Sequence, residues 1–360
     1  MNNKALAAVA LLALILSACS KSSQPQKTAA TPPATPVAPN AASPNATAPV
    51  AAPVATAAPA RGVKTEMRNV LFHLSDRAAA HLEVLSGELW PTGKNEMPVF
   101  DDKNSFEVHV TSGKVSISPQ ALASILNNHV FARSDAPLKD LSITIENQSM
   151  RIKGKLHSKG DIPFETTGTL SVNPDGRIRV KTEKVKALHV PMKGVMGVFG
   201  IELADVVNTS QIAGLDTAKN DLLMDLGTLL PPPHIRGKVT AVKLENDAIV
   251  TYFGDGGASL PPPTETGSYM KFEGNPVRFG KMTMESADLV VLDMDASGTL
   301  DWSQDHYRDQ LVAGYSKITP AFGLRAYVKD FGKLPRTPDP ASAPPATPAQ
   351  PPTPAAPGKS

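Results

Sequence analysis

The stretch "FETTGTLSVNPDGRIRVKTEKV", residues 164–185, carries the clearest structural signal in this chain of 360 residues. Apolar and polar residues alternate on both sides of Asn173-Pro174-Asp175-Gly176, a segment with the composition of a tight turn. Alternation with a period of two is typical of a strand with one buried and one solvated face. The stretch therefore predicts an antiparallel β-hairpin.

Three more segments show the same alternation and predict further hairpins. They are residues 105–118, with a turn at Ser112-Gly113, residues 141–157, with a turn near Glu146-Asn147, and residues 235–253, with Glu245-Asn246-Asp247 at the tip. Hairpins in succession predict a long, curved antiparallel sheet.

Helical signals are fewer. Ser118-Pro119 is a helix start followed by an apolar stripe that reaches Val130, and we expect two more helices at Val195 to Asn208 and at His306 to Tyr315. The predicted class is α+β, with the long curved antiparallel sheet packed around one or two helices. We expect a main domain at residues 63–255, a linker at 256–266 and a smaller C-terminal α+β subdomain at 267–334. Whether these pieces form one domain or two stays open.

The first 19 residues predict a lipoprotein signal peptide. Lys4 precedes an apolar run that ends in "LSAC", which matches the lipobox whose cysteine receives acyl chains such as palmitate after cleavage. Cys19 is the only cysteine, so we expect lipidation there and no internal disulfide. The alternatives are an ordinary signal peptide or a membrane helix, for which the run is short. No aspartate follows Cys19, which by resemblance to sorted lipoproteins indicates the periplasmic side of a Gram-negative outer membrane.

Two segments have the composition of disordered chain. Residues 28–60 contain no Asp, Glu, Lys or Arg and are mostly Ala, Pro, Thr and Val. We expect residues 20–62 to be a disordered, extended Ala/Pro-rich tether and residues 335–360 to be a disordered Pro/Ala-rich tail.

Positive charge is local. Residues 63–334 hold 30 Lys and Arg against 33 Asp and Glu, whereas residues 150–193 hold 10 basic and 4 acidic residues. A nucleic-acid-binding protein is usually basic more broadly, with interleaved aromatic residues, and only 5% of this chain is aromatic. We expect no nucleic-acid partner.

The cations form two rows because alternate residues of a strand share a face. One row is in "MRIKGKLHSKG", residues 150–160, and the other follows the turn at residue 176. A solvated sheet face explains such rows, and the competing hypothesis is a platform for anionic lipid headgroups. The candidate headgroup residues are Arg151, Lys153, Lys155, Lys159, Arg177, Arg179 and Lys181, with His157 in the same row.

Motifs for metal or catalytic chemistry are weak. Asp293, Asp295 and Asp301 in "DMDASGTLDW" resemble a calcium loop, but Gln304 stands where that loop needs a bidentate glutamate, so we favour a polar turn. No HExxH or GxSxG motif occurs, which favours a protein that is not an enzyme and has no cofactor. An envelope hydrolase built on paired carboxylates remains an alternative.

The order of strands, helix and hairpins over residues 105–255 resembles the LmeA-like bacterial phospholipid-binding proteins, which are similar to the tubular lipid-binding superfamily. This resemblance implies a curved sheet around a helix, with an apolar groove for acyl chains. The residues that would line the groove are Ile152, Leu156, Leu170, Ile178, Val180, Met192, Met196 and Phe199. We expect a lipid-anchored envelope protein that binds phospholipid or a similar amphiphile. The alternative is a structural or interaction module with a filled core and no ligand.

Overall fold

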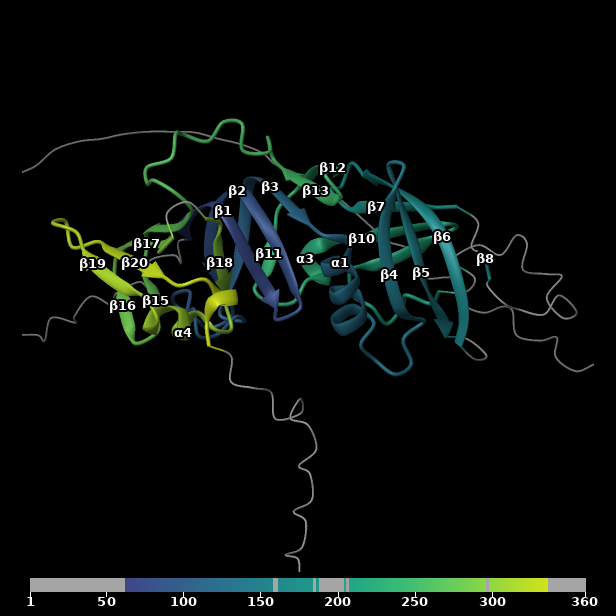
Figure 1. Cartoon of the computed structure of the whole chain (residues 1–360), viewed down its shortest axis with the longest axis horizontal. Helices are drawn as coiled ribbons and strands as arrows, with labels where there is room; N and C mark the ends of the chain where they lie inside the picture. Colours follow the sequence, from purple (N-terminus) through teal and green to yellow (C-terminus); the bar gives the residue numbers. More distant parts are fainter. Residues whose placement is uncertain are drawn as a thin grey trace, which may run out of the picture. The chain divides into compact units, whose positions relative to one another are not determined.

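A computed structural model describes residues 62–157, 161–183, 186–187, 204, 207–295 and 298–335 of the chain. These residues belong to one of its two compact units, residues 57–360. The described part is mostly β, with long antiparallel sheets and a few short helices (Figure 1). The predicted signal peptide, lipidated Cys19, most of the tether and nearly all of the tail lie outside the described residues.

The larger sheet has eleven strands in the order β12-β13-β3-β2-β1-β14-β17-β20-β19, with β11 paired to β3 and β18 paired to β1. We call it the eleven-stranded sheet. Its strands are β1 (Val63–Ser75), β2 (Ala78–Pro91), β3 (Phe106–Ile117), β11 (His234–Arg236), β12 (Val239–Glu245), β13 (Ala248–Phe253), β14 (Tyr269–Gly274), β17 (Ala287–Asp293), β18 (Leu300–Ser303), β19 (Tyr315–Ile318) and β20 (Leu324–Val328).

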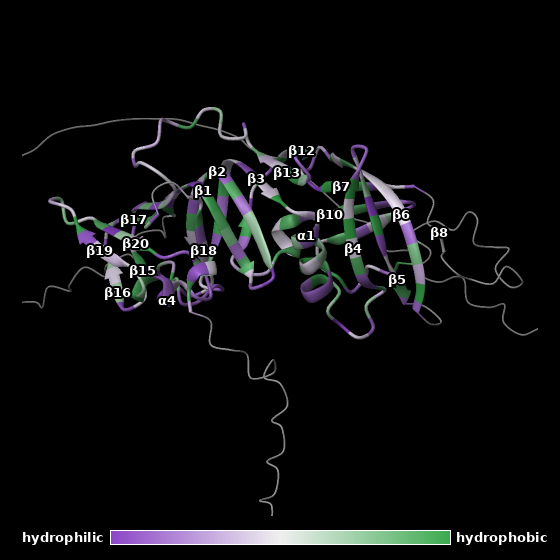
Figure 2. Ribbon diagram, in the orientation of Figure 1, coloured by the Kyte–Doolittle hydropathy of each residue, from purple (hydrophilic) through white to green (hydrophobic). Residues whose placement is uncertain are grey.

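The second sheet has seven strands in the order β4-β5-β6-β7-β10-β9, with β8 paired to β6. These are β4 (Leu138–Glu146), β5 (Ser149–His157), β6 (Asp161–Val172), β7 (Ile178–Thr182), β8 (Lys186–Ala187), β9 (Leu215–Ala218) and β10 (Asp221–Met224). A small hairpin is formed by β15 (Val277–Phe279) and β16 (Met282–Met284). Figure 2 shows hydrophobic and hydrophilic residues alternating along β4 and β5, the pattern from which these strands were predicted.

The hairpin predicted over residues 164–185 is confirmed as β6 and β7. The amide of Gly176 donates to the carbonyl of Asn173 at 2.9 Å, and Gly176 has φ +87°, a conformation that glycine adopts without strain. The hairpins formed by β4 with β5 and by β12 with β13 are confirmed as well.

The turn predicted at Ser112-Gly113 is wrong, because residues 106–117 form the single strand β3. This strand pairs along its length with β2, and on its other side with β11 and then β13. Gly113 does not form a turn. It lets β3 approach β2 closely, because a Cβ at this position would lie 3.0 Å from the carbonyl oxygen of Val84. Ser112 is buried and donates to the carboxylate of Asp255, while its Oγ accepts from the amide of Gly257 at 2.7 Å.

Asp255 gives the fold a pH-dependent contact. Hydrogen bonds from Ser112, Ser259 and the amide of Gly257 hold the pKa of this carboxyl well below its usual range. A carboxyl whose pKa is lower in the folded state stabilises the fold above its unfolded pKa of about 3.9, and the contribution is lost as pH falls through the folded value. We therefore expect Asp255→Asn to lower the melting temperature at pH 7, with the difference from wild type narrowing below about pH 4.

Thermal unfolding followed by circular dichroism from pH 7 to pH 2 checks this, with Asp247→Asn in the exposed β12–β13 turn as the control. A difference between wild type and Asp255→Asn that stays constant over this range would contradict the assignment.

The strands are divided between two large sheets rather than placed in the single long sheet that the hairpins predicted. The main reason is β1 and β2, a long hairpin that the sequence analysis missed. β14 pairs with β1 from Val63↔Gly274 to Arg68↔Tyr269, so the predicted main domain and C-terminal subdomain share one sheet. Residues 256–266 contain no strand or helix, as their composition suggested.

Helices are short. The helix predicted after Ser118 is confirmed as α1 (Pro119–Ile125), in which Ser118 Oγ accepts from the amide of Ala121 at 3.1 Å, and it continues as a π-helical turn, η1 (Leu126–Val130). The helix predicted at 306–315 is α4 (Tyr307–Val312), and Tyr315 begins β19 instead. The described residues also include α3 (Leu226–Leu229) and the 3-10 turn η2 (Phe331–Lys333). The helix predicted at 195–208 lies mostly outside the described residues.

Candidate functional site

An apolar cavity of about 160 Å³ lies where the two large sheets face each other. The eleven-stranded sheet contributes residues of β1, β2, β3, β11 and β13, and the seven-stranded sheet contributes residues of β5, β6, β7 and β10. The rest come from α1, η1, α3 and the segment that joins α3 to β11. Central lining residues are Leu82, Leu85, Val110, Leu170, Ile178 and Met224. Among the described lining residues, Thr251 is the only one with a polar side chain.

The cavity includes part of the predicted acyl groove. Leu170 and Ile178 line it, at the ends of β6 and β7 nearest their turn. Ile152, Leu156 and Val180 pack in the hydrophobic core but are not among the lining residues, because the seven-stranded sheet extends beyond the cavity. Met192, Met196 and Phe199 lie outside the described residues.

The opposite wall, made by β1 and β2, was not predicted from the sequence. In β1 the buried positions are Val63, Thr65 and Met67 and then Val70, so the alternation changes phase at Asn69, which has φ +52°. β2 changes phase opposite this point, between Leu82 and Leu85. The matched irregularities keep both strands facing the core, but each interrupts the period-two signal.

The size of the cavity limits what it holds. An apolar cavity of about 150 Å³ lined by aliphatic and aromatic residues stays dry and binds benzene. The cavity between the sheets is of similar volume, so it fits a short length of hydrocarbon chain rather than a whole diacyl lipid. Each methylene buried there contributes about 0.8 kcal/mol.

The two rows of cations are paired with acidic side chains. Arg151 contacts Glu146 at 3.0 Å and Glu165 at 3.6 Å, and Lys155 contacts Asp140 at 2.7 Å. The remaining pairs are Lys153 with Glu165, His157 with Asp161, Arg177 with Asp175 and Asp216, and Arg179 with Asp221. Lys159 lies outside the described residues, and Lys181 has no ionic partner among those that are described.

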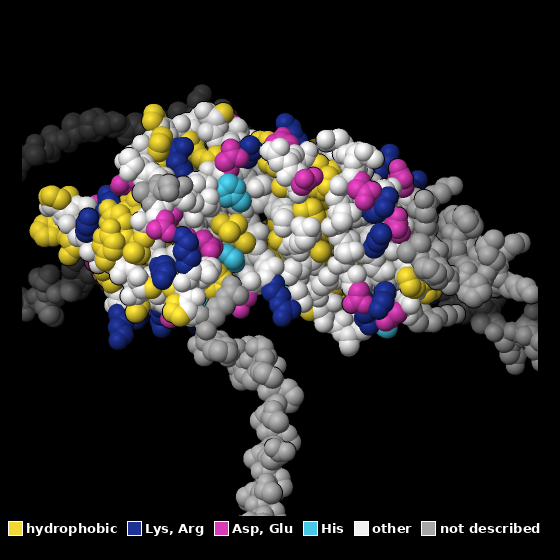
Figure 3. All heavy atoms as spheres, viewed as in Figure 1, with side chains coloured by type: hydrophobic (Ala, Val, Ile, Leu, Met, Phe, Trp, Pro, Cys, Tyr) yellow, Lys and Arg dark blue, Asp and Glu magenta, His cyan; other side chains and the backbone are white. Residues whose placement is uncertain are grey.

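Figure 3 shows Lys and Arg side chains next to Asp and Glu side chains over the region of β4, β5 and β6. Four of the acids, Asp140, Glu146, Asp216 and Asp221, lie outside residues 150–193, so the sequence window counted the cations without their partners. Exposed pairs of this kind contribute about 0–1 kcal/mol each. The arrangement is that of a solvated sheet face with balanced charge.

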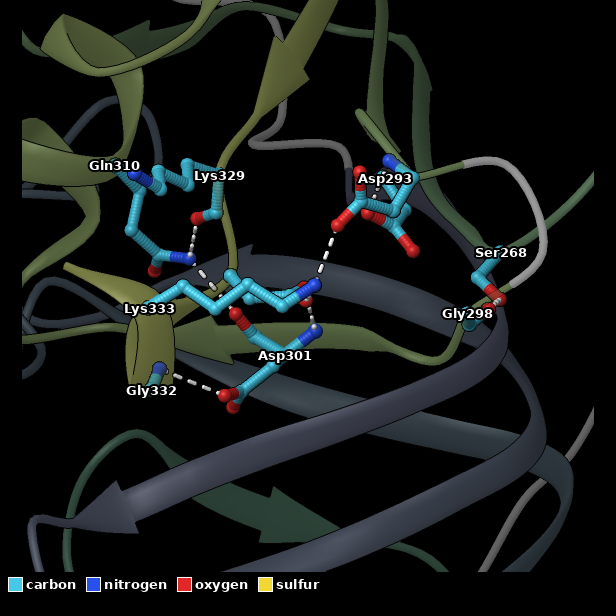
Figure 4. Close-up of polar contacts among 10 residues, drawn as sticks. Ser268, Asp293, Gly298, Asp301, Gln310, Lys329, Gly332 and Lys333 are labelled. Atoms are coloured by element: carbon cyan, nitrogen blue, oxygen red, sulfur yellow. Dashed lines mark hydrogen bonds and ion pairs between the residues drawn. The ribbon is translucent and has the colours of Figure 1, made fainter.

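Three carboxylates gather at one edge of the eleven-stranded sheet. One oxygen from each of Asp293, Asp295 and Asp330 lies within 4.8 Å of the other two, and we call this group the carboxylate cluster. Lys333 Nζ contacts Asp330 at 2.8 Å and also pairs with Asp295 (Figure 4). Asp330 was not predicted as a site residue, because it lies 35 positions after Asp295 in the sequence.

Asp301, the third aspartate of the weak calcium candidate, makes other contacts. Its carboxylate contacts His73 Nε2 at 2.6 Å and accepts from the amide of Gly332 at 2.8 Å. Burial opposes ionisation of Asp301, but the hydrogen bonds from His73 and Gly332 outweigh it and lower the pKa of this carboxyl. Asp301 therefore joins β18 to β1 and η2, and it is not grouped with Asp293 and Asp295.

Within the described ranges, no helix combines the length and the apolar character needed to cross a bilayer. No protein-family model, curated protein or solved structure matches the chain.

Proposed function

We propose that this protein binds the hydrocarbon part of a phospholipid or similar amphiphile in the cavity between its two sheets, and that it is not an enzyme. The observation that carries the proposal is the cavity itself, about 160 Å³ with apolar lining from both sheets. Its lining holds no charged side chain among the described residues, so a headgroup would stay outside while a tail enters.

The energetics of an empty apolar cavity support this proposal. Protein interiors are close-packed, and residual cavity volume costs about 24 cal/mol per Å³. For this cavity of about 160 Å³ the cost is about 4 kcal/mol. A hydrocarbon ligand would recover the lost contacts, which gives binding a favourable free energy without any polar interaction.

The proposed setting is the cell envelope. Lipidation of Cys19, with the chain between it and β1 as a tether, would hold the domain at the periplasmic side of an outer membrane within reach of lipid. The proposed relationship is to the LmeA-like and tubular lipid-binding proteins, with the sheets curved around α1. In this scheme the membrane and the bound amphiphile are the partners.

A second candidate is a structural module of the envelope that binds no ligand. The observation that favours it is the pairing of the cationic rows, which removes the headgroup platform that the sequence suggested. The two candidates differ in whether hydrocarbon enters the cavity.

A cavity-filling substitution tests the proposal. Leu170 lines the cavity from β6, and Leu170→Trp would occupy the space with a larger side chain. We expect the purified protein to bind a dansyl-labelled undecanoic acid saturably, in competition with added phospholipid, and Leu170→Trp to weaken this binding at least tenfold. The fluorescence increase of the dansyl group on titration is the measurement.

Ile152→Trp is the matched control, because Ile152 packs on the same sheet without lining the cavity. We expect Ile152→Trp to bind the probe as wild type does, provided that its circular dichroism spectrum is unchanged. Binding that Leu170→Trp leaves unaltered would place the ligand elsewhere. A wild-type protein without saturable binding would favour the structural module.

A further inference from the structure

Asp293 is a buried carboxylate with one oxygen left unpaired. The residue is 6% exposed at the end of β17. Its Oδ1 accepts from the amide of Asp295 at 2.8 Å, whereas its Oδ2 has no hydrogen-bond partner among the described residues. Burying a carboxylate oxygen without a hydrogen-bond partner destabilises the folded protein, and a cation bound to that oxygen would reduce this loss.

Asp293 also belongs to the carboxylate cluster. The three ligand oxygens, one each from Asp293, Asp295 and Asp330, lie within 4.8 Å of one another. Calcium–oxygen bonds are about 2.3–2.6 Å long, so one Ca²⁺ can contact oxygens up to about 5 Å apart. Magnesium–oxygen bonds of about 2.1 Å limit that span to about 4.2 Å. The spacing suits Ca²⁺ better than Mg²⁺.

The topology of the sheet places these residues together. β17 and β20 are parallel neighbours, with Asp293 opposite Val328. Parallel strands end at the same edge, so Asp295, just after β17, meets Asp330, just after β20. Residue 298 is a glycine that passes close to this carboxylate, because a Cβ there would come within 2.8 Å of Asp293 Oδ2.

The ammonium group of Lys333 is a cation that already contacts the carboxylate cluster. Its Nζ pairs with Asp295 and Asp330 but has no contact with Asp293 Oδ2 among the described interactions (Figure 4). The Lys333 side chain is 55% exposed and long enough to move into solvent. One ammonium group therefore pairs with two carboxylates, whose combined charge exceeds its own, and leaves Asp293 Oδ2 without a partner among the described residues.

We propose that the carboxylate cluster binds a divalent cation of the calcium class through Asp293, Asp295 and Asp330, in competition with the ammonium group of Lys333. Water molecules complete the coordination, because Ca²⁺ takes six to eight oxygen ligands. The bound ion joins the end of β17 to the segment that leads into η2. This site is independent of the apolar cavity and of any lipid ligand.

The test is calcium titration of the purified full chain after treatment with EDTA. Isothermal titration calorimetry measures the affinity, and thermal unfolding with 1 mM CaCl₂ or MgCl₂ measures stabilisation. We expect Ca²⁺ to raise the melting temperature by several degrees and Mg²⁺ to raise it less. Asp293→Asn, which keeps the shape of the side chain, should lower Ca²⁺ affinity at least tenfold, whereas Lys333→Met should raise it by a similar factor.

Asp247→Asn and Lys281→Met, both at exposed positions outside the cluster, are the matched controls and should titrate like wild type. A wild-type protein and a Lys333→Met variant that both show no heat of binding would overturn the proposal, even if Asp293→Asn fails to fold. Equal Ca²⁺ affinity in wild type and folded Asp293→Asn would overturn it as well, because the ion would then bind elsewhere.

Discussion

Replacing Trp302 by alanine is expected to lower the free energy of unfolding by about 3–5 kcal/mol. Trp302 is 0% exposed on β18, which pairs in parallel with β1 in the middle of the eleven-stranded sheet. Its ring centroid lies 5.8 Å from that of Tyr307 and 6.4 Å from that of Phe279. Alanine would leave a cavity in this aromatic cluster and remove its ring–ring contacts.

Urea unfolding followed by far-ultraviolet circular dichroism measures this loss, and Trp302→Phe is the control. The indole Nε1 has no hydrogen-bond partner among the described residues. Phenylalanine removes that unpaired donor while it keeps an aromatic ring, so we expect Trp302→Phe to cost less than half as much as Trp302→Ala. Equal losses of unfolding free energy in Trp302→Phe and Trp302→Ala would contradict the explanation that packing of the aromatic ring stabilises this cluster.

The second large effect is expected for Gln310→Leu, at about 3–5 kcal/mol of unfolding free energy. Gln310, in α4, is 0% exposed. Its Nε2 donates to the carbonyls of Asp301 at 2.7 Å and Lys329 at 2.8 Å (Figure 4). Its Oε1 accepts from the amide of Ser303 at 2.8 Å. Leucine fills a similar volume but leaves three backbone groups unpaired, at about 1–3 kcal/mol each.

Gln304→Leu is the matched control because Gln304 is also buried but makes one such contact, from Nε2 to the carbonyl of Phe100 at 2.7 Å. We expect it to cost about a third as much as Gln310→Leu in the same urea titration. If the two variants were equally destabilised, the loss would come from burial of the glutamine side chain in general and not from the three contacts of Gln310.

Local sequence signals predicted the hairpins correctly where the residues at the tip strongly favour turn conformations. Asn173-Pro174-Asp175-Gly176 and Glu245-Asn246-Asp247 both form the predicted tips. The same reasoning failed at Ser112-Gly113, because a glycine required for close approach inside a sheet has the same local signature as a glycine in a turn. It also missed β1 and β2, where paired changes of phase hide the alternation.

In the candidate sites too, the sequence revealed residues that are close together in the chain and missed their distant partners. The cationic positions of β5 and β7 were identified from the sequence, but Asp140 and Asp221, which pair with Lys155 and Arg179, come from other strands or their connections. The aspartate motif pointed to the correct loop, yet the third carboxylate beside it is Asp330 and not Asp301. In each case the missing partner is distant in the chain.

By itself, the sequence determined three of the β-hairpins, their alternating pattern and the turns that join their strands, because these properties depend on residues within a few positions of one another. Only the tertiary structure decided that the strands form two sheets with a cavity between them, that the cationic rows are neutralised, and that three aspartates share one edge. Those features depend on pairing between strands far apart in the chain, and period-two patterns carry no information on which strand pairs with which.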